Sequence, residues 1–133
     1  MATITGWLAV VAFVAAALLP ISTRLRFRTR AELAHPSVKN HVLVGMIALA
    51  IGSMHPLTAL FQLGSPEAIG GGNVGLALGG LAFVILISHS GLGLKLRDPK
   101  LRGRPRSRRA HVITATLLSV AAVAHALACR FSV

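Results

Sequence analysis

Acidic and aromatic side chains are scarce in this sequence. Its 133 residues include 3 Asp and Glu against 14 Lys and Arg, and aromatic residues make up 5% of the chain, with no tyrosine. A single cysteine is present, which excludes a disulfide framework within the chain. Charged residues reach 13%, whereas a soluble domain carries about 25%. These shortages exclude an ordinary soluble catalytic domain.

Apolar residues, at 54% of the chain, gather in long runs. A helix needs about 20 such residues to cross the hydrocarbon core of a membrane. Runs near this length cover residues 4–21, 38–63, 68–92 and 110–129. We therefore expect an all-α integral membrane protein. Its fold would be an up-down bundle of four transmembrane helices, forming a single membrane domain over residues 1–133 and surrounded by lipid.

The positive charges predict the orientation of this bundle. Every Lys and Arg except Arg130 falls in or next to two connections, residues 22–37 and 93–109. By the positive-inside rule these basic loops are cytoplasmic, so both termini lie outside in a multi-pass protein of the inner or plasma membrane. The Arg-rich run 102–109 is interpreted as an orientation signal that also meets anionic lipid, and no nucleic acid partner is expected.

Four histidines form two equally spaced pairs inside or at the ends of apolar runs. His41 and His55 fall in the second run, and His111 and His125 in the fourth, each pair fourteen positions apart. Fourteen residues of helix rise about 21 Å and return to within about 40° of the same face. Because the second and fourth helices would run in the same direction, His41 should face His111, and His55 should face His125. Ionisable groups inside a membrane point to function.

Two imidazoles on facing helices can coordinate a haem iron from both sides, with the macrocycle between the helices. The ligand faces should then be narrow, and we expect Gly45 and Gly52 to help admit the porphyrin. Both faces carry small residues: His41, Gly45, Ala48, Gly52 and His55 in the second helix, and His111, Ala115, Leu118, Ala122 and His125 in the fourth. A zinc site is disfavoured because the histidines of one helix are too far apart. Histidines that only hydrogen-bond between helices are the alternative.

The paired His-x13-His pattern on the second and fourth of four helices resembles the dihaem core of membrane b-type cytochromes. It is similar to the first four helices of the cytochrome b of respiratory quinol oxidoreductases and to the haem-binding helices of the ferric reductase and NADPH oxidase superfamily. The resemblance implies two b-type haems with bis-histidine ligation, an inner haem on His41 and His111 and an outer haem on His55 and His125. The quinone-site motifs of the first family and the flavin and nicotinamide domain of the second have no counterpart in the sequence.

Three further residues are candidates for the site. His89 lies near the cytoplasmic end of the third run, where it could bond a haem propionate, contact a quinone, or replace His41; a role other than ligand is favoured. Arg130, five residues after His125, could meet a propionate of the outer haem or reach the membrane surface as a terminal residue. Cys129 is expected to be a buried, inert thiol.

The sequence thus favours transmembrane electron transfer by a dihaem b-type cytochrome. With so little chain outside the membrane, it would act as an electron-carrier subunit of a larger oxidoreductase, with redox partner proteins on one or both faces, rather than as a self-sufficient enzyme. One alternative is a haem-free membrane anchor or accessory subunit. Another is a quinone-linked reductase.

Overall fold

A computed structural model describes residues 2–28, 35–61 and 71–131 of the chain. Within them the backbone forms four helices, α1 (Ala2–Phe27), α2 (Pro36–Leu60), α3 (Gly72–Lys95) and α4 (Arg104–Phe131). Each is long and apolar enough to cross a membrane. The expected all-helical architecture with four membrane-spanning candidates is confirmed.

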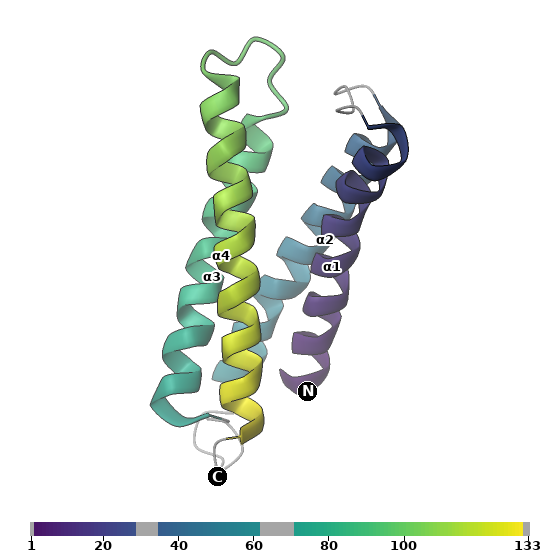
Figure 1. Cartoon of the computed structure of the whole chain (residues 1–133). Helices are drawn as coiled ribbons and strands as arrows, with labels where there is room; N and C mark the ends of the chain where they lie inside the picture. The colour runs from purple at the N-terminus through teal and green to yellow at the C-terminus, as the bar shows by residue number, and fades with distance from the viewer. Residues whose placement is uncertain (1, 29–34, 62–70, 132–133) are drawn as a thin grey trace.

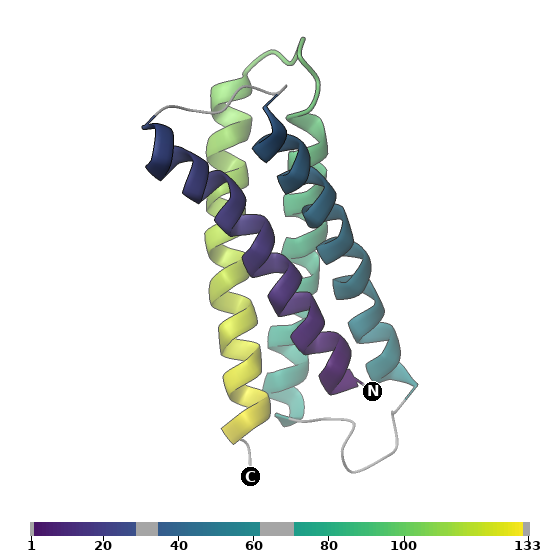
Figure 2. The same ribbon diagram turned by 90° about the vertical axis from the view of Figure 1, so that its right-hand side faces the viewer.

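The helices pair as two hairpins. α1 packs along α2, and α3 packs along α4, while α2 and α3 make less extensive contact (Figures 1 and 2). The start of α1 and the end of α4 lie at one end of the molecule, and the α3–α4 connection lies at the other. This arrangement is consistent with an up-down four-helix bundle. The end that carries the α3–α4 connection is called the basic end below, because Lys95 and the arginines from Arg97 to Arg109 gather there.

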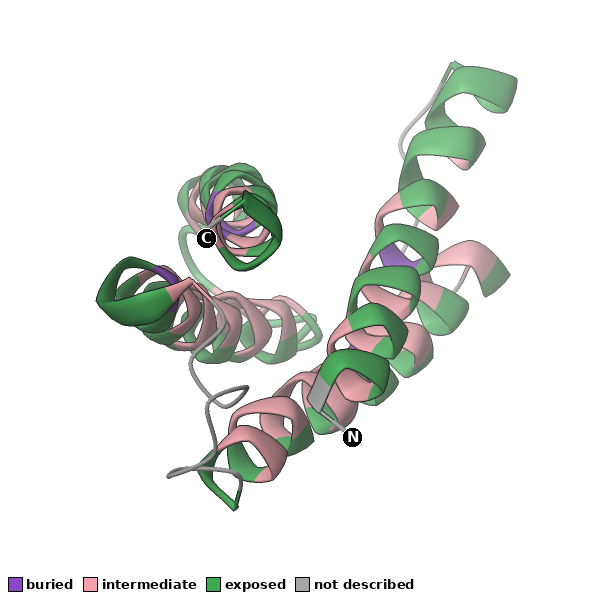
Figure 3. Ribbon diagram, turned by 90° about the horizontal axis from the view of Figure 1, so that it is seen from below, coloured by how far each residue is buried: buried purple, intermediate pink, exposed green. Residues whose placement is uncertain are grey.

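Little of the surface is buried between the helices. Among the described residues, burial is confined to Ala16, Ala48, Gly75, Leu118 and Ala121 (Figure 3). Four of these five have the smallest side chains, which lets helix backbones approach closely. Large apolar side chains instead face outward on all four helices. Such a surface suits lipid rather than water, so the apolar helices suggest a multi-pass protein in contact with membrane lipid.

The helices extend further into the basic flanks than the apolar runs do. α1 continues to Phe27, α3 to Lys95, and α4 begins at Arg104 rather than near residue 110. Hydropathy marks where a helix leaves lipid, whereas backbone hydrogen bonding continues because Arg and Lys are good helix formers. Only residues 96–103 are left to connect α3 and α4. The expected helical residues 62–63 and 68–70 lie outside the described part of the chain.

Hydrogen bonds define the starts of α2 and α4. Before α2, the Nδ1 atom of His35 accepts the N–H of Ser37 at 3.2 Å, and Pro36 occupies the first helical position, where a missing N–H costs nothing. Before α4, Gly103 has a φ of 72°, which favours glycine. The guanidinium of Arg104 then donates to the carbonyls of Leu96, at 3.0 Å, and of Asp98. The starts of both histidine-bearing helices are therefore well defined.

Candidate functional site: two histidine pairs between α2 and α4

The histidines of α2 and α4 meet as two pairs. The ring centroids of His41 and His111 are 6.2 Å apart with ring planes at 83°, and those of His55 and His125 are 6.0 Å apart with planes at 69°. The pair His41 and His111, at the basic end, is called the inner pair, and His55 with His125 the outer pair. The structure therefore brings together the same partners that the fourteen-residue spacing predicts.

The two helices that carry these histidines are themselves not closely packed. In the described residues, close backbone contact is found within each hairpin and to a lesser degree between α2 and α3, but α2 and α4 are not among the closely packed helices. The facing imidazoles thus span a separation between the hairpins. Each of the four rings also has its Nδ1 edge held by α1 or α3, the helices that supply no member of the pairs.

Backbone carbonyls of α1 and α3 bind the Nδ1 atoms of three histidines. His41 Nδ1 lies 2.8 Å from the carbonyl oxygen of Ala16, and His125 Nδ1 lies 2.8 Å from that of Gly75. His111 Nδ1 lies 3.2 Å from the carbonyl oxygen of His89. A carbonyl can only accept, so Nδ1 is the donor in each bond. In a neutral imidazole the lone pair is then on Nε2, which is the form of histidine that binds metals.

His55 differs from the other three. Its Nδ1 atom lies 3.3 Å from the Thr5 hydroxyl oxygen, which in turn lies 3.1 Å from the hydroxyl oxygen of Thr58. Thr58 donates its own proton to the His55 carbonyl at 2.8 Å, so it accepts from Thr5. The His55 ring is thus linked through Thr5 to Thr58. A hydroxyl chain therefore replaces the carbonyl at this ring.

Glycines of α1 and α3 lie directly against the histidine rings. A Cβ atom added to Gly79 would lie 2.9 Å from Cε1 of His125, and one added to Gly93 would lie 3.2 Å from Cε1 of His111. At Gly6 the added atom would lie 3.1 Å from Cε1 of His55. The sequence-based prediction did not assign Gly79 and Gly93 to the histidine rings. Their fourteen-residue separation, equal to that of the histidines, is the signal that could have done so.

The two glycines predicted to admit a porphyrin behave differently from each other. A Cβ at Gly45 would meet no atom within 4 Å, so the helix surface is open there. A Cβ at Gly52 would lie 2.6 Å from Leu86 of α3. Gly52 therefore allows close approach of a neighbouring helix, and Gly45 leaves free space on the ligand face of α2.

His89 stacks on a member of the inner pair. Its ring lies parallel to that of His111, with centroids 3.9 Å apart and planes at 12°. The Thr114 hydroxyl donates to the His111 carbonyl at 3.0 Å and lies 3.0 Å from His89 Nδ1, so it accepts the Nδ1–H of His89. A ring stacked on His111 lies beside it, whereas a replacement for His41 would face it across a metal. The geometry therefore favours a supporting role for His89.

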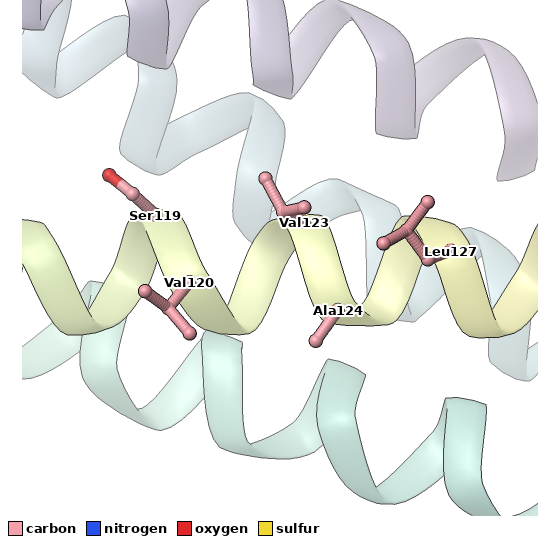
Figure 4. Close-up of a pocket in the computed structure, with 5 residues that line it drawn as sticks. All are labelled: Ser119, Val120, Val123, Ala124 and Leu127. Carbon is pink, nitrogen blue, oxygen red and sulfur yellow. The ribbon is translucent and has the colours of Figure 1, made fainter.

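The remaining candidates lie at the far end of α4. Cys129 Sγ is 3.7 Å from His125 Nδ1, and Arg130 is exposed in the last turn of the helix. Cys129 is exposed as well, so the expected burial of its thiol is wrong, because the residue lies in the same outward-facing last turn of α4. A shallow apolar hollow on α4 is lined by Ser119, Val120, Val123, Ala124 and Leu127 (Figure 4). None of the histidines contributes to that hollow, which offers no groups for chemistry.

No protein-family model, curated protein or solved structure matches this chain.

Proposed function

We propose that this chain is a transmembrane electron-transfer subunit that holds two b-type haems, one between the inner pair and one between the outer pair. The observation that supports this proposal most directly is the distance between the ring centroids of each pair, 6.2 Å for the inner pair and 6.0 Å for the outer pair. Two imidazoles bound on opposite sides of one metal, with metal–nitrogen bonds of about 2 Å, have ring centroids about 6.3 Å apart. Both pairs match this value.

The donor set also fits a haem. Nδ1–H donation to backbone carbonyls orients His41, His111 and His125 and leaves Nε2 for a metal, as outer-shell partners of metal-binding histidines do. In the described residues no group of three or more His, Cys, Asp or Glu side chains could hold a metal ion alone. Two protein ligands per metal suit an iron whose other four positions are filled by a macrocycle. Bound haem would supply the one-electron chemistry of its iron.

The chain itself would hold the two sites at different depths. Fourteen residues of helix separate the members of each helix by about 21 Å along the axis, so the pairs fall in opposite leaflets. If the basic end is cytoplasmic, as the positive-inside rule predicts, both termini lie outside and the inner pair lies nearer the cytoplasm of an inner or plasma membrane. An electron that crossed the whole membrane would couple to its potential by about 2.3 kcal/mol per 100 mV.

Partners must supply and remove the electrons. The described residues form four membrane-spanning candidates and short connections, with no room among them for a nicotinamide or flavin domain. We propose redox proteins on one or both faces as partners, within a larger oxidoreductase. A quinone as the direct donor would make the chain a quinone-linked reductase, which ranks below the subunit role.

A haem-free anchor or accessory subunit is the second candidate. It is favoured by the hydrogen bonds that tie His41 to α1 and His111 and His125 to α3, since these contacts also pack helices without a metal. Cofactor content separates the two candidates, because a haem-free anchor has no visible absorption.

Haem content is the test. We expect the purified protein to show low-spin b-type spectra, oxidised and dithionite-reduced, with two haems per chain by pyridine haemochrome. Replacing both inner histidines (His41→Ala with His111→Ala) should leave one haem per chain, whereas His35→Asn, which keeps a helix-capping side chain, should leave two. Absence of haem from folded protein made with adequate iron would contradict the proposal, and so would two haems in the double variant.

A further inference from the structure

Helix α1 contains an internal proline, Pro20. Proline has no N–H and cannot donate to the carbonyl four residues earlier in a helix. For Pro20 that carbonyl belongs to Ala16, a residue only 5% exposed. A buried carbonyl without its helical donor is costly unless another group donates to it. The position of Pro20 therefore creates an open acceptor within the bundle.

His41 occupies that acceptor. Its Nδ1 atom lies 2.8 Å from the Ala16 oxygen. The bond joins α1 to the ligand face of α2, and because the carbonyl only accepts, it places the proton of a neutral His41 on Nδ1. The lone pair then stays on Nε2.

The same relation recurs in α3 by a different means. The carbonyls of Gly75 and His89, which bind His125 and His111, each lie four residues before a glycine, Gly79 or Gly93. A helical side chain covers the turn that precedes it, so a glycine uncovers the carbonyl for the approaching ring. Pro20 stands in the same place relative to Ala16. Pro20 carries a side chain and cannot uncover the carbonyl as a glycine does. Its contribution is the loss of the N–H that would otherwise share the two lone pairs of the Ala16 oxygen with His41.

We propose that Pro20 is a positioning residue for His41. Its missing N–H reserves the Ala16 carbonyl for His41 and thereby fixes the Nδ1–H tautomer, with Nε2 available to a metal. The last step rests on the proposed haem function, but the tautomer itself can be measured without haem.

The first measurement uses haem-free protein with 15N-labelled histidine. We expect one Nδ1–H tautomer for His41, identified by the signals lost in His41→Ala. Pro20→Ala restores the N–H and should populate both tautomers. Replacement of Pro20 by lactic acid, the α-hydroxy analogue of alanine, puts an ester in place of the amide and supplies no N–H. It should keep the native tautomer. The tautomer of His125, at the other end of the bundle, should be the same in the parent protein, in Pro20→Ala and in the lactic acid variant.

Two results would overturn the proposal. One is a single Nδ1–H tautomer for His41 in Pro20→Ala. The other is a lactic acid variant that behaves like Pro20→Ala, because the proline ring and not the missing N–H would then be responsible. Helix content by circular dichroism checks that each variant is folded.

The second measurement uses the haem-loaded protein. Loss of the carbonyl bond makes a histidine ligand less basic, so Pro20→Ala should raise the midpoint potential of the inner couple. We expect about a tenfold shift in its reduction equilibrium constant, or about 59 mV for a one-electron couple, with the outer couple unchanged. A tautomer change without this shift would overturn the link to the metal. Protein that never holds haem would refute the proposed function, while the tautomer measurement would still decide the role of Pro20.

Discussion

His89 shows how one side chain can distinguish two sites of otherwise similar design. It stacks on His111 at 3.9 Å, and its own backbone carbonyl accepts the Nδ1–H of that ring. The inner pair is therefore supported by both the side chain and the backbone of one residue. At the outer pair, the corresponding carbonyl belongs to Gly75, which has no side chain to stack on His125.

If the pairs hold haem as proposed, replacement of His89 tests whether this residue supports the inner site or is itself a ligand of the iron. A stacked aromatic pair contributes about 0.5–1.5 kcal/mol, so His89→Ala should weaken haem binding at the inner site by up to about tenfold. The outer site should be unaffected. Haem titration of haem-free protein, followed by difference spectra, measures both sites. Complete loss of low-spin haem from the inner site would instead make His89 a ligand.

Helix α3 contributes no member of the histidine pairs, yet it holds two of their rings. Gly79 lies against the ring of His125, and Gly93 lies against that of His111. The Nδ1–H groups of these two histidines donate to the carbonyls of Gly75 and His89, which lie one turn before the glycines. In α1, Gly6 and Pro20 are also fourteen residues apart. The two helices without a paired histidine thus carry the same fourteen-residue repeat as the two helices that have them.

A glycine pair within α3 allows a matched test of this role. A Cβ at Gly79 would lie 2.9 Å from His125, closer than such contacts allow, whereas one at Gly80 would meet no atom within 4 Å. Gly79→Ala should displace His125 and lower haem affinity at the outer site by about tenfold or more, as loss of outer-shell support typically does. Gly80→Ala should match the parent protein. Equal haem affinities for the two variants would contradict the assigned role of Gly79.

The sequence was enough to predict the four spans and the partners of each histidine. The spans follow from apolar runs within single helices, and the partners follow from the fourteen-residue spacing together with the alternating direction of successive helices. Contacts that depend on the register between helices could not be predicted. The stacking of His89 on His111 and the bond from His41 to Ala16 require knowing how far α3 is shifted against α4, and α1 against α2. Helix ends were also missed, since α4 begins at Arg104 in a polar segment that hydropathy does not recognise as helix.

The whole molecule has an asymmetric distribution of charge along its long axis. Lys95 and the following basic residues gather at one end, together with Arg24, Arg26 and Arg28 at the close of α1. The start of α1 and the end of α4 lie at the opposite end (Figure 1). An up-down bundle with this charge distribution should insert in one orientation.

Cysteine labelling measures that orientation. Cys129 is the only native cysteine, so Cys129→Ser gives a background to which single cysteines can be added. With a membrane-impermeant thiol reagent on intact cells, Thr3→Cys should react, and Arg102→Cys should react only after the membrane is opened. Reaction of Arg102→Cys in intact cells would reverse the assigned orientation, and reaction of both would contradict the up-down arrangement.

The limited contact between the two hairpins has a consequence for biogenesis. Each hairpin packs closely within itself, and the hairpins approach each other mainly through α2, α3 and the paired imidazoles. We expect each hairpin to insert into the membrane as its own unit, with their association as a later event. If haem occupies the pairs, its delivery would be the event that joins the halves, and the supply of haem would govern how much mature protein accumulates.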